Sequence, residues 1–206
     1  MKDCFFIFDN FFEKNVVDSL NTFLVDFGDH KKWPFIKKEN VDKDLDIINQ
    51  VLYLTWFEKL SFLNDKDIRG FEVWSNCVTK SALHLHVDCD EEHYYKHNEV
   101  IPPKYTSVLY TGPKNALVGG ELAINLNGIK YFTDNLNADI QQYPEKIKKD
   151  TKNWLTIPYK YNRLIVFDAN CPHCVLNIQS GTENAPRTAL TMALWDHEVS
   201  IQTNNE

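Results

Sequence analysis

The chain changes its pattern at Gly70, and this change constrains the fold more than any other feature. Before it, apolar residues recur at helical spacing over 12–27, closed by Gly28, and again over 40–63, after a short apolar run at 4–8 that predicts a first strand. After it come short segments that alternate or are wholly apolar, separated by Gly, Pro and Asn turns. Each predicts a strand: 71–74, 83–88, 105–110, 121–126, 154–158, 163–167, 174–178 and 187–195.

Helices followed by about eight short strands predict a fold that is mainly β with flanking helices. The core is expected to be a double-stranded β-helix, that is, a cupin-like jelly roll. A chain of 206 residues suits a single domain, with an N-terminal helical support over about 1–68 and the jelly-roll core over about 69–198. Residues 131–132 begin a possible further strand, and the polar stretch 133–152 predicts a long surface loop.

Composition narrows the classes of partner. The formal net charge is −7 and the basic clusters are short and mixed with acids, so binding to nucleic-acid phosphates is not expected. No run of about 18 apolar residues predicts a membrane span, and the N-terminus lacks a signal sequence. We therefore expect a cytoplasmic protein, a monomer or homodimer, with no membrane partner.

The five cysteines predict free thiols, because their number is odd and no export signal precedes them. Cys171 and Cys174 form a CxxC pair that invites a zinc interpretation. A structural zinc site would need a second pair at comparable spacing, and Cys77 and Cys89 match it poorly. We therefore expect no zinc site here.

Two histidines and one carboxylate suggest a metal site. His86 and Asp88 are two positions apart in a predicted strand, so their side chains should share one face. His173, from a distant strand, can join them only if the sheet folds over, as it does in a jelly roll. Such a set occupies one face of a ferrous ion and leaves the other open. His84 has the same strand parity, but the carboxylate spacing favours His86.

A guanidinium follows the second histidine. Arg187 is suited to bind the carboxylate of a co-substrate, since its planar fork matches that group. The alternative is a surface ion pair with Glu183 or Asp196. Asp168 ends a predicted strand, so a turn role is expected for it rather than metal binding.

These segments, taken in order, resemble the Fe(II)/2-oxoglutarate-dependent oxygenases, specifically the prolyl-4-hydroxylase-like branch, over about 71–196. His86-Val87-Asp88 is similar to the HxD element of that family. The other similar segments are the GGEL turn at 119–122, the strand 163–168 that precedes His173, and the arginine segment formed by Gly181 and 187–191. The turn 182–186 is longer than in most relatives.

The resemblance implies an enzyme that hydroxylates an aliphatic C–H of an amino-acid, peptidyl or related small-molecule substrate. His86, Asp88 and His173 would bind Fe(II), and Arg187, with Tyr110 and Thr191, would bind 2-oxoglutarate. Dioxygen is consumed, 2-oxoglutarate is decarboxylated to succinate, and ascorbate serves as reductant. Halogenating relatives have a small residue at the carboxylate position, so Asp88 favours hydroxylation.

Two alternatives remain open. One is a non-catalytic jelly-roll domain that binds or senses a ligand, and the other is a base hydroxylase or demethylase acting on nucleic acid with the same iron chemistry. We expect residues 91–103 and 133–152 to determine the substrate. For Tyr110 the alternative is an aromatic residue of the core. Several further aromatic residues and histidines are expected to pack in the core or lie on the surface rather than in the site: Trp74, Tyr105, Trp195, His30, His93, His97 and His197.

Overall fold

The computed structural model describes most of the chain, and the account below is confined to that part. The described residues are 5–63, 66–79, 83–115, 117–135, 140, 143–183 and 185–199. The first residue of the expected strand 4–8 and one residue of the turn 182–186 lie outside them. Among the helices of these segments, none is long and apolar enough to cross a membrane.

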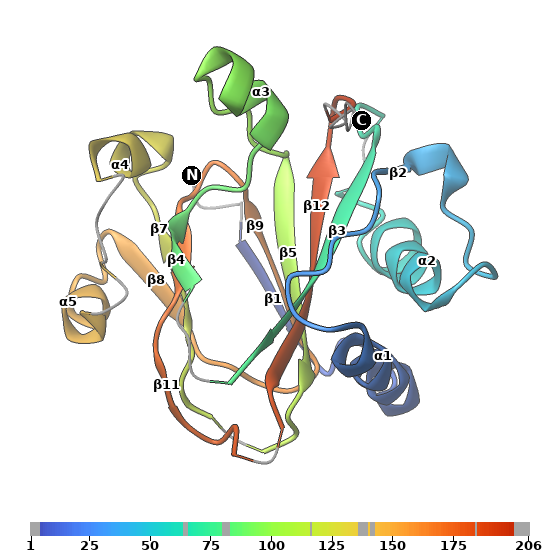
Figure 1. Cartoon of the computed structure of the whole chain (residues 1–206), viewed down its shortest axis with the longest axis horizontal. Coiled ribbons are helices and arrows are strands. Elements are labelled where there is room, and N and C mark those ends of the chain that lie inside the picture. Colours follow the sequence, from blue (N-terminus) through green and yellow to red (C-terminus); the bar gives the residue numbers. More distant parts are fainter. Residues whose placement is uncertain are drawn as a thin grey trace, which may run out of the picture.

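Two facing β-sheets form the core, as expected for a jelly roll (Figure 1). The larger sheet has the order β1-β9-β5-β12-β3-β2 and the smaller one β4-β10-β7-β8, and β11 pairs with β6 at one end. The strands are β1 (Phe5–Asp9), β2 (Ile36–Lys37), β3 (Gly70–Val78), β4 (Leu83–His86), β5 (Tyr105–Gly112), β6 (Val118–Gly119), β7 (Leu122–Asn125), β8 (Trp154–Ile157), β9 (Arg163–Asp168), β10 (His173–Val175), β11 (Ile178–Ser180) and β12 (Arg187–Trp195).

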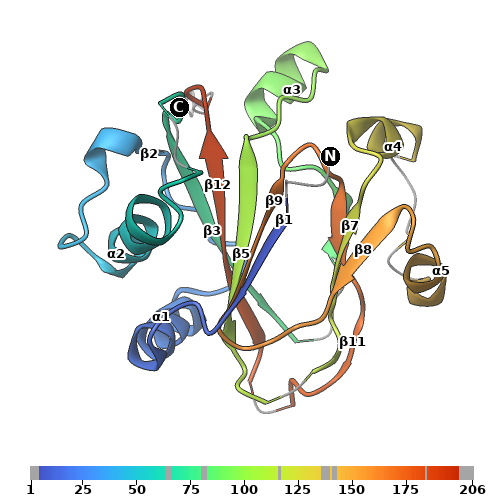
Figure 2. The same ribbon diagram turned by 180° about the vertical axis from the view of Figure 1, so that it is seen from behind.

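Helices α1 (Lys14–Phe27) and α2 (Ile47–Leu52) cover the outer face of the larger sheet, as the view from behind also shows (Figure 2). The largest apolar core lies between these helices and the sheet. It contains Leu20, Leu24, Trp56, Phe71, Val73, Leu190, Met192 and Leu194. The helices in the first third of the chain therefore pack against the strands from outside, whereas β1 and β2 belong to the larger sheet itself.

The second helix is shorter than its apolar pattern suggests. The pattern covers 40–63, but a 3-10 turn occupies Lys38–Asn40, α2 begins only at Ile47 and continues as a π-helix over Tyr53–Lys59. The Asp46 side chain accepts a hydrogen bond from the Asn49 backbone amide at 2.8 Å and caps the start of the helix. An Asp in this position marks a helix start, and the apolar residues before it do not extend the helix.

Strand β12 places small residues on its interior face. Leu190, Met192 and Leu194 point to the helices, so Ala189, Thr191 and Ala193 face the smaller sheet by strand alternation. Small side chains at these interior positions leave room between the two sheets. The candidate site lies in that space.

Two helices lie where the sequence suggests a strand at 131–132 and a loop over 133–152, and residues 136–139, 141 and 142 of that loop lie outside the described residues. Helices α4 (Ile129–Asp134) and α5 (Pro144–Lys149) lie outside the smaller sheet, where Ile147 packs in a cluster with Trp154 and Ala123 (Figure 1). The expectation of a strand at 131–132 is therefore wrong. The 129–134 segment is only six residues long, too short for its apolar residues to establish either alternation or a helical period.

Candidate functional site

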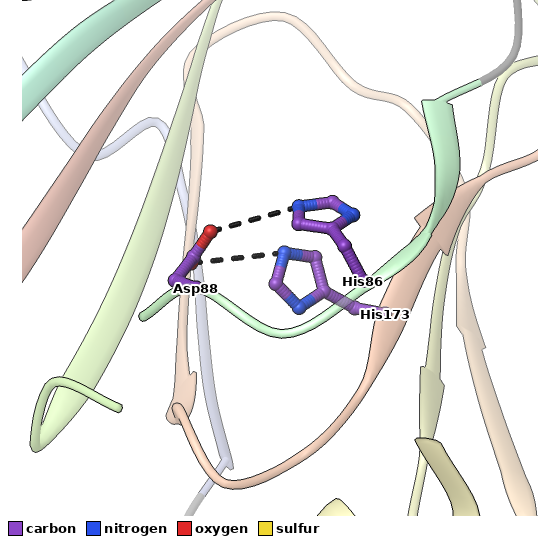
Figure 3. A group of neighbouring side chains, drawn as sticks. All are labelled: His86, Asp88 and His173. Carbon is purple, nitrogen blue, oxygen red and sulfur yellow. Dashed lines mark ion pairs between the residues drawn. The ribbon is translucent and has the colours of Figure 1, made fainter. Parts of the chain in front are cut away.

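Two of the three candidate ligands are a cross-strand pair. His86 at the end of β4 lies opposite His173 at the start of β10, and the ring centroids are 4.2 Å apart. Asp88 completes the group: its carboxylate oxygens lie 3.6 Å from Nε2 of His86 and 3.8 Å from Nε2 of His173 (Figure 3). One ligand atom from each residue falls within 4.8 Å of the others, close enough to hold one metal ion.

Asp88 reaches this position by a different route from the one expected. Strand β4 ends at His86, so strand alternation does not by itself place the carboxylate. Val87 is buried, and Asp88 begins the connection to helix α3 (Glu91–His97). The Thr106 hydroxyl, on β5 of the opposite sheet, donates a hydrogen bond to Asp88 Oδ2 at 2.6 Å. This contact orients the carboxylate toward the two imidazoles.

Both imidazoles present Nε2 to the site. Nδ1 of His86 lies 2.7 Å from the His84 carbonyl oxygen, and Nδ1 of His173 lies 3.3 Å from that of Cys171. A carbonyl oxygen only accepts, so each Nδ1 carries the proton and each Nε2 is left with a lone pair. Backbone contacts of this kind set the tautomer of histidine ligands in metal sites.

The ionisation states also suit metal binding. Burial lowers the pKa of His173 to about 4, and His86 contributes to the same effect. Burial acts to raise the pKa of the Asp88 carboxyl, but His173, His86 and Thr106 together hold it below its ordinary value. Burial acts to lower the pKa of His86, and Asp88 reverses this, so it is raised. A buried carboxylate beside a neutral imidazole is an appropriate pair of ligands for a divalent cation.

Arg187 is buried between the sheets, with 2% of its surface exposed. Its guanidinium carbon lies 4.7 Å from the centroid of the Tyr110 ring. Neither Nε of Arg187 nor the Tyr110 hydroxyl has a hydrogen-bond partner in the described part of the chain, and there Arg187 forms no ion pair with Glu183 or Asp196. Buried donors without partners are costly, and a carboxylate placed between them would satisfy both.

The Gly119-Gly120 turn brings the chain close to Arg187. Gly119 has φ +82°, and a Cβ there would lie 2.1 Å from the Asn177 carbonyl oxygen. Gly120 has φ +69°, and a Cβ there would lie 3.6 Å from Cδ of Arg187. The left-handed backbone favours glycine at both positions, and at Gly119 the close approach of Asn177 leaves no room for a Cβ. Physical constraints therefore explain this part of the GGEL segment.

One cavity joins the two candidate histidine ligands to the arginine. The empty space between its walls, counted out to the open mouth, is about 580 Å³. His86, His173, Arg187 and Thr191 all line it, whereas Tyr110 lies beneath the guanidinium. The Thr191 hydroxyl accepts a hydrogen bond from the Asn76 amide at 2.9 Å.

Sequence analysis missed several residues of this site. Thr106 and Asn76 were not singled out, and Trp74 and His30 were expected in the core and in solvent, yet the last two line the cavity beside Asn76. The available signal was strand alternation in β3, where Trp74 and Asn76 share one face. Trp195, by contrast, is fully buried, as expected.

Other residues took the places expected of them. Asp168 accepts hydrogen bonds from the backbone and side-chain amides of Asn170, which is a turn role. Cys77, Cys89, Cys171 and Cys174 are free thiols, and the only group in the described residues that could hold a metal is the His86, Asp88 and His173 set. Cys4 lies outside the described residues.

Comparison with solved structures identifies the architecture. A prolyl-4-hydroxylase from Pseudomonas putida superposes with a TM-score of 0.60 at 14% identity, over 96% of this chain and 90% of its own. A Trichoplax adhaerens prolyl hydroxylase, solved with a hypoxia-inducible-factor peptide, gives 0.54 at 16% identity over 95% and 84%. HygX from Streptomyces hygroscopicus, solved with nickel and 2-oxoglutarate, gives 0.53 at 10% identity over 92% and 81%.

The chain has the fold of the prolyl hydroxylases and related 2-oxoglutarate, Fe(II) oxygenases. The expected jelly-roll core is thereby confirmed. By sequence, no family model and no curated protein matches the chain. At these identities the likeness establishes the fold, and the chemistry must be argued from the residues themselves.

Proposed function

We propose that this protein is an Fe(II)- and 2-oxoglutarate-dependent dioxygenase that hydroxylates an aliphatic C–H bond. One observation carries the proposal. The two-histidine, one-carboxylate group and the partnerless donors of Arg187 and Tyr110 belong to the same buried site between the sheets. The first is suited to a ferrous ion with open positions, and the second to the far carboxylate of a dicarboxylic co-substrate.

The roles of the residues follow from this arrangement. His86, Asp88 and His173 would hold the iron on one side and leave the opposite side free. Arg187 and the Tyr110 hydroxyl would bind the C5 carboxylate, and Thr191, held by Asn76, would contribute to the same pocket. Bound iron and 2-oxoglutarate supply dioxygen activation, in which 2-oxoglutarate becomes succinate and carbon dioxide and the substrate C–H becomes C–OH.

The protein surroundings restrict that chemistry to the bound substrate. The apolar walls next to the site, including Val108 and Leu122, exclude water from the co-substrate pocket. Asp88 occupies the position that a halide would need, so hydroxylation is the expected outcome. Ascorbate would serve as an external reductant.

We propose an amino-acid, peptidyl or related small molecule as the substrate. One solved structure of similar fold holds a peptide, which supports this class. The acid-rich stretch 88–92, which begins at the candidate ligand Asp88, opposes a nucleic-acid substrate. A protein that keeps the site only to bind a ligand is the second candidate, favoured if 2-oxoglutarate binds without turnover.

Succinate release tests the proposal. The protein would be incubated with Fe(II), 2-oxoglutarate, ascorbate and air, together with free amino acids, peptides or nucleosides. We expect iron-dependent succinate that one amino-acid or peptide class stimulates. Stimulation by nucleosides alone would favour the base hydroxylase, and binding of 2-oxoglutarate without any succinate would favour the sensor domain.

A further inference from the structure

A second cavity opens beside the candidate metal group. It encloses about 850 Å³, counted to its mouth, and its lining includes Asp88, Cys89 and Glu91 but not Arg187. It meets the Arg187 cavity along a shared wall formed by His30, Trp74, Asn76, Leu83 and His86. A molecule in the second cavity would therefore lie against the metal position without displacing the co-substrate.

Strand β3 forms one wall of this cavity. Its residues alternate between two environments: Phe71 and Val73 pack into the core under the helices, whereas Glu72, Trp74 and Asn76 line the cavity. Because side chains alternate along a strand, the polar and aromatic row is continuous. A charged residue of β3, the strand next to the edge of the larger sheet, thus faces the site.

The segment before β2 extends that wall. The backbone of Lys32 pairs with that of Trp74 in an isolated antiparallel β-bridge, and the Ser75 amide donates a hydrogen bond to the Lys31 carbonyl oxygen at 2.9 Å. This pairing makes the segment a short edge to β3, and alternation along it turns His30 and Lys32 toward the cavity. Lys32 is held by the backbone at the rim, where half of its side chain is exposed.

Glu72 is a largely buried carboxylate in this wall. Only 9% of its side chain is exposed, and Oε1 lies 2.7 Å from Nζ of Lys32. Among the residues that the structure describes, Glu72 forms an ion pair with no cation other than Lys32, although a carboxylate has several acceptor positions. Burial raises the pKa of the Glu72 carboxyl, Glu91 and Asp88 act in the same direction, and Lys32 opposes them. A second cation beside Oε2 would stabilise the charged form.

The remaining lining favours the same kind of ligand. With Asp88 assigned to the metal, Glu72 and Glu91 face the single cation Lys32, which leaves one negative charge in excess. Trp74 provides an aromatic surface in the same wall, and aromatic faces attract ammonium and guanidinium groups. Charge and aromatic surface thus favour a positively charged organic group.

On the basis of the proposed oxygenase function, we infer that this cavity binds the positively charged group of the substrate, with Glu72 as its anchor. The substrate class is then an amine. The charge is either the α-ammonium of a free amino acid or the ammonium or guanidinium of a basic side chain. Glu72 and Trp74 are specificity residues in this account, because they select the substrate and take no part in oxygen chemistry.

Titration calorimetry with capped amino acids tests the inference. The protein, loaded with Fe(II) and 2-oxoglutarate under argon, would be titrated at about pH 6.5, where amines are protonated. L-norleucinamide carries only an α-ammonium, N-acetyl-L-lysinamide only a side-chain ammonium, and N-acetyl-L-norleucinamide no charge. We expect one of the two cations to bind at least about tenfold more tightly than the neutral compound, because only a cation can form a charge-assisted hydrogen bond with the carboxylate. The preferred cation identifies the source of the charge.

A charge-removing variant locates the anchor. Glu72→Gln keeps the shape of the side chain, and we expect the preference to fall to within about threefold. Glu145→Gln makes the same change at an exposed position of α5, outside the smaller sheet, and should keep the full preference. If Glu72→Gln fails to fold by circular dichroism, Glu91→Gln at the cavity mouth should reduce the preference. An unchanged preference in a folded Glu72→Gln protein would overturn the assignment.

The same titrations separate this inference from the proposed function. Binding of iron and 2-oxoglutarate is measured first. Suppose that iron and 2-oxoglutarate both bind. If the neutral compound then binds as tightly as the cations, or if neither cation binds, the inference alone fails. If 2-oxoglutarate does not bind, the proposed function fails, and the cation preference is still scored on the protein without it.

Discussion

His86 and His173 lie directly opposite each other on neighbouring antiparallel strands, with ring centroids 4.2 Å apart. A single cross-strand pair thus provides two candidate ligands from segments far apart in the sequence. The pair sits on the smaller sheet, and Thr106 on the larger sheet holds the third ligand, Asp88, against it. The site therefore depends on both sheets being in place.

Removal of one histidine should abolish iron binding, whereas removal of its neighbour should not. His86→Ala deletes a ligand, and we expect no saturable Fe(II) binding and no iron-dependent succinate. His84→Ala is the matched control, because His84 is exposed on the same strand and contributes its backbone carbonyl to His86. Calorimetry with Fe(II) under argon measures both. Equal iron affinity of His86→Ala and wild type would refute the ligand assignment.

The carboxylate ligand has its own test. Asp88→Ala and Asp88→Gly both remove the charge, and both should lose hydroxylation. If either substitution left the hydroxylated product unchanged, Asp88 could not be a ligand. Mass spectrometry of the substrate makes this comparison once a substrate has been found.

The hydroxyl of Thr106 should tune the metal affinity. Thr106→Val preserves the shape of the side chain and removes the donor to Asp88 Oδ2, and we expect about a tenfold loss of iron affinity, typical of contacts that orient a ligand. Thr106→Ser retains a hydroxyl and should recover most of the affinity. If the Val variant binds iron as well as the Ser variant, the contact does not orient Asp88.

Arg187→Ala should affect the co-substrate rather than the iron. Loss of a charge-assisted pair in a buried pocket is expected to raise the 2-oxoglutarate concentration for half-saturation about 100-fold. Iron affinity should change little, because the guanidinium belongs to a different part of the cavity. Saturation curves for Fe(II) and for 2-oxoglutarate, both measured by succinate release, make the comparison. Equal losses for iron and 2-oxoglutarate would contradict a carboxylate-binding role.

Tyr110→Phe should have effects of opposite sign on stability and binding. The Tyr110 hydroxyl is buried without a partner among the described residues, so its removal should raise the free energy of unfolding of the ligand-free protein by up to about 1 kcal/mol. The same change removes a donor to the co-substrate and should weaken 2-oxoglutarate binding about tenfold. Urea unfolding and calorimetry give the two values. A destabilised variant with full 2-oxoglutarate affinity would show that Tyr110 serves packing alone.

Local patterns predict individual strands but not which strands become neighbours. Residues 187–195 form a mostly apolar run that predicts a strand, and the structure places β12 over those positions. Asp88 illustrates a partial success, since the spacing selected it although β4 ends two residues earlier. The pairing of His86 with His173 could be anticipated only as a consequence of the jelly roll, because no local pattern records which distant strands become neighbours.

Other features left no signal in the hydrophobic pattern. Thr106 supports Asp88 from the facing sheet, a contact that depends on tertiary packing. Helix α3 begins with Asp90 accepting a hydrogen bond from the His93 amide at 2.9 Å, and its polar, aromatic sequence shows no apolar periodicity because no residue of it is buried. A helix without a buried face is invisible to a method that relies on hydrophobic spacing.

Acid should weaken the attachment of strand β1. Hydrogen bonds from Arg163 and Lys160 lower the pKa of Asp9 to about 2 from its ordinary 3.8, so the ion pairs stabilise the fold above about pH 4 and are lost as the pH falls toward 2. Because 36% of the Asp9 side chain is exposed, solvent screening limits the effect of Asp9→Asn to about 0.5–1 kcal/mol at pH 7.

Urea unfolding of the Asp9→Asn variant at pH 7, 5 and 3 checks this pH dependence. The difference in the free energy of unfolding between the variant and wild type should be the same at pH 7 and 5 and smaller at pH 3. Asp26→Asn, at an exposed position of α1 without an ion pair in the described residues, is the control and should have little effect. A difference for Asp9→Asn that is constant across the three pH values would contradict the ion-pair account.

Conversion of 2-oxoglutarate to succinate by the purified protein, with and without Fe(II), is the most direct measurement of the central claim. We predict succinate formation in air that requires iron, is blocked by a chelator, and is absent in His173→Ala protein whose circular dichroism matches wild type. Succinate formed at the same rate by His173→Ala, or no succinate from wild-type protein with iron and 2-oxoglutarate bound, would contradict the account.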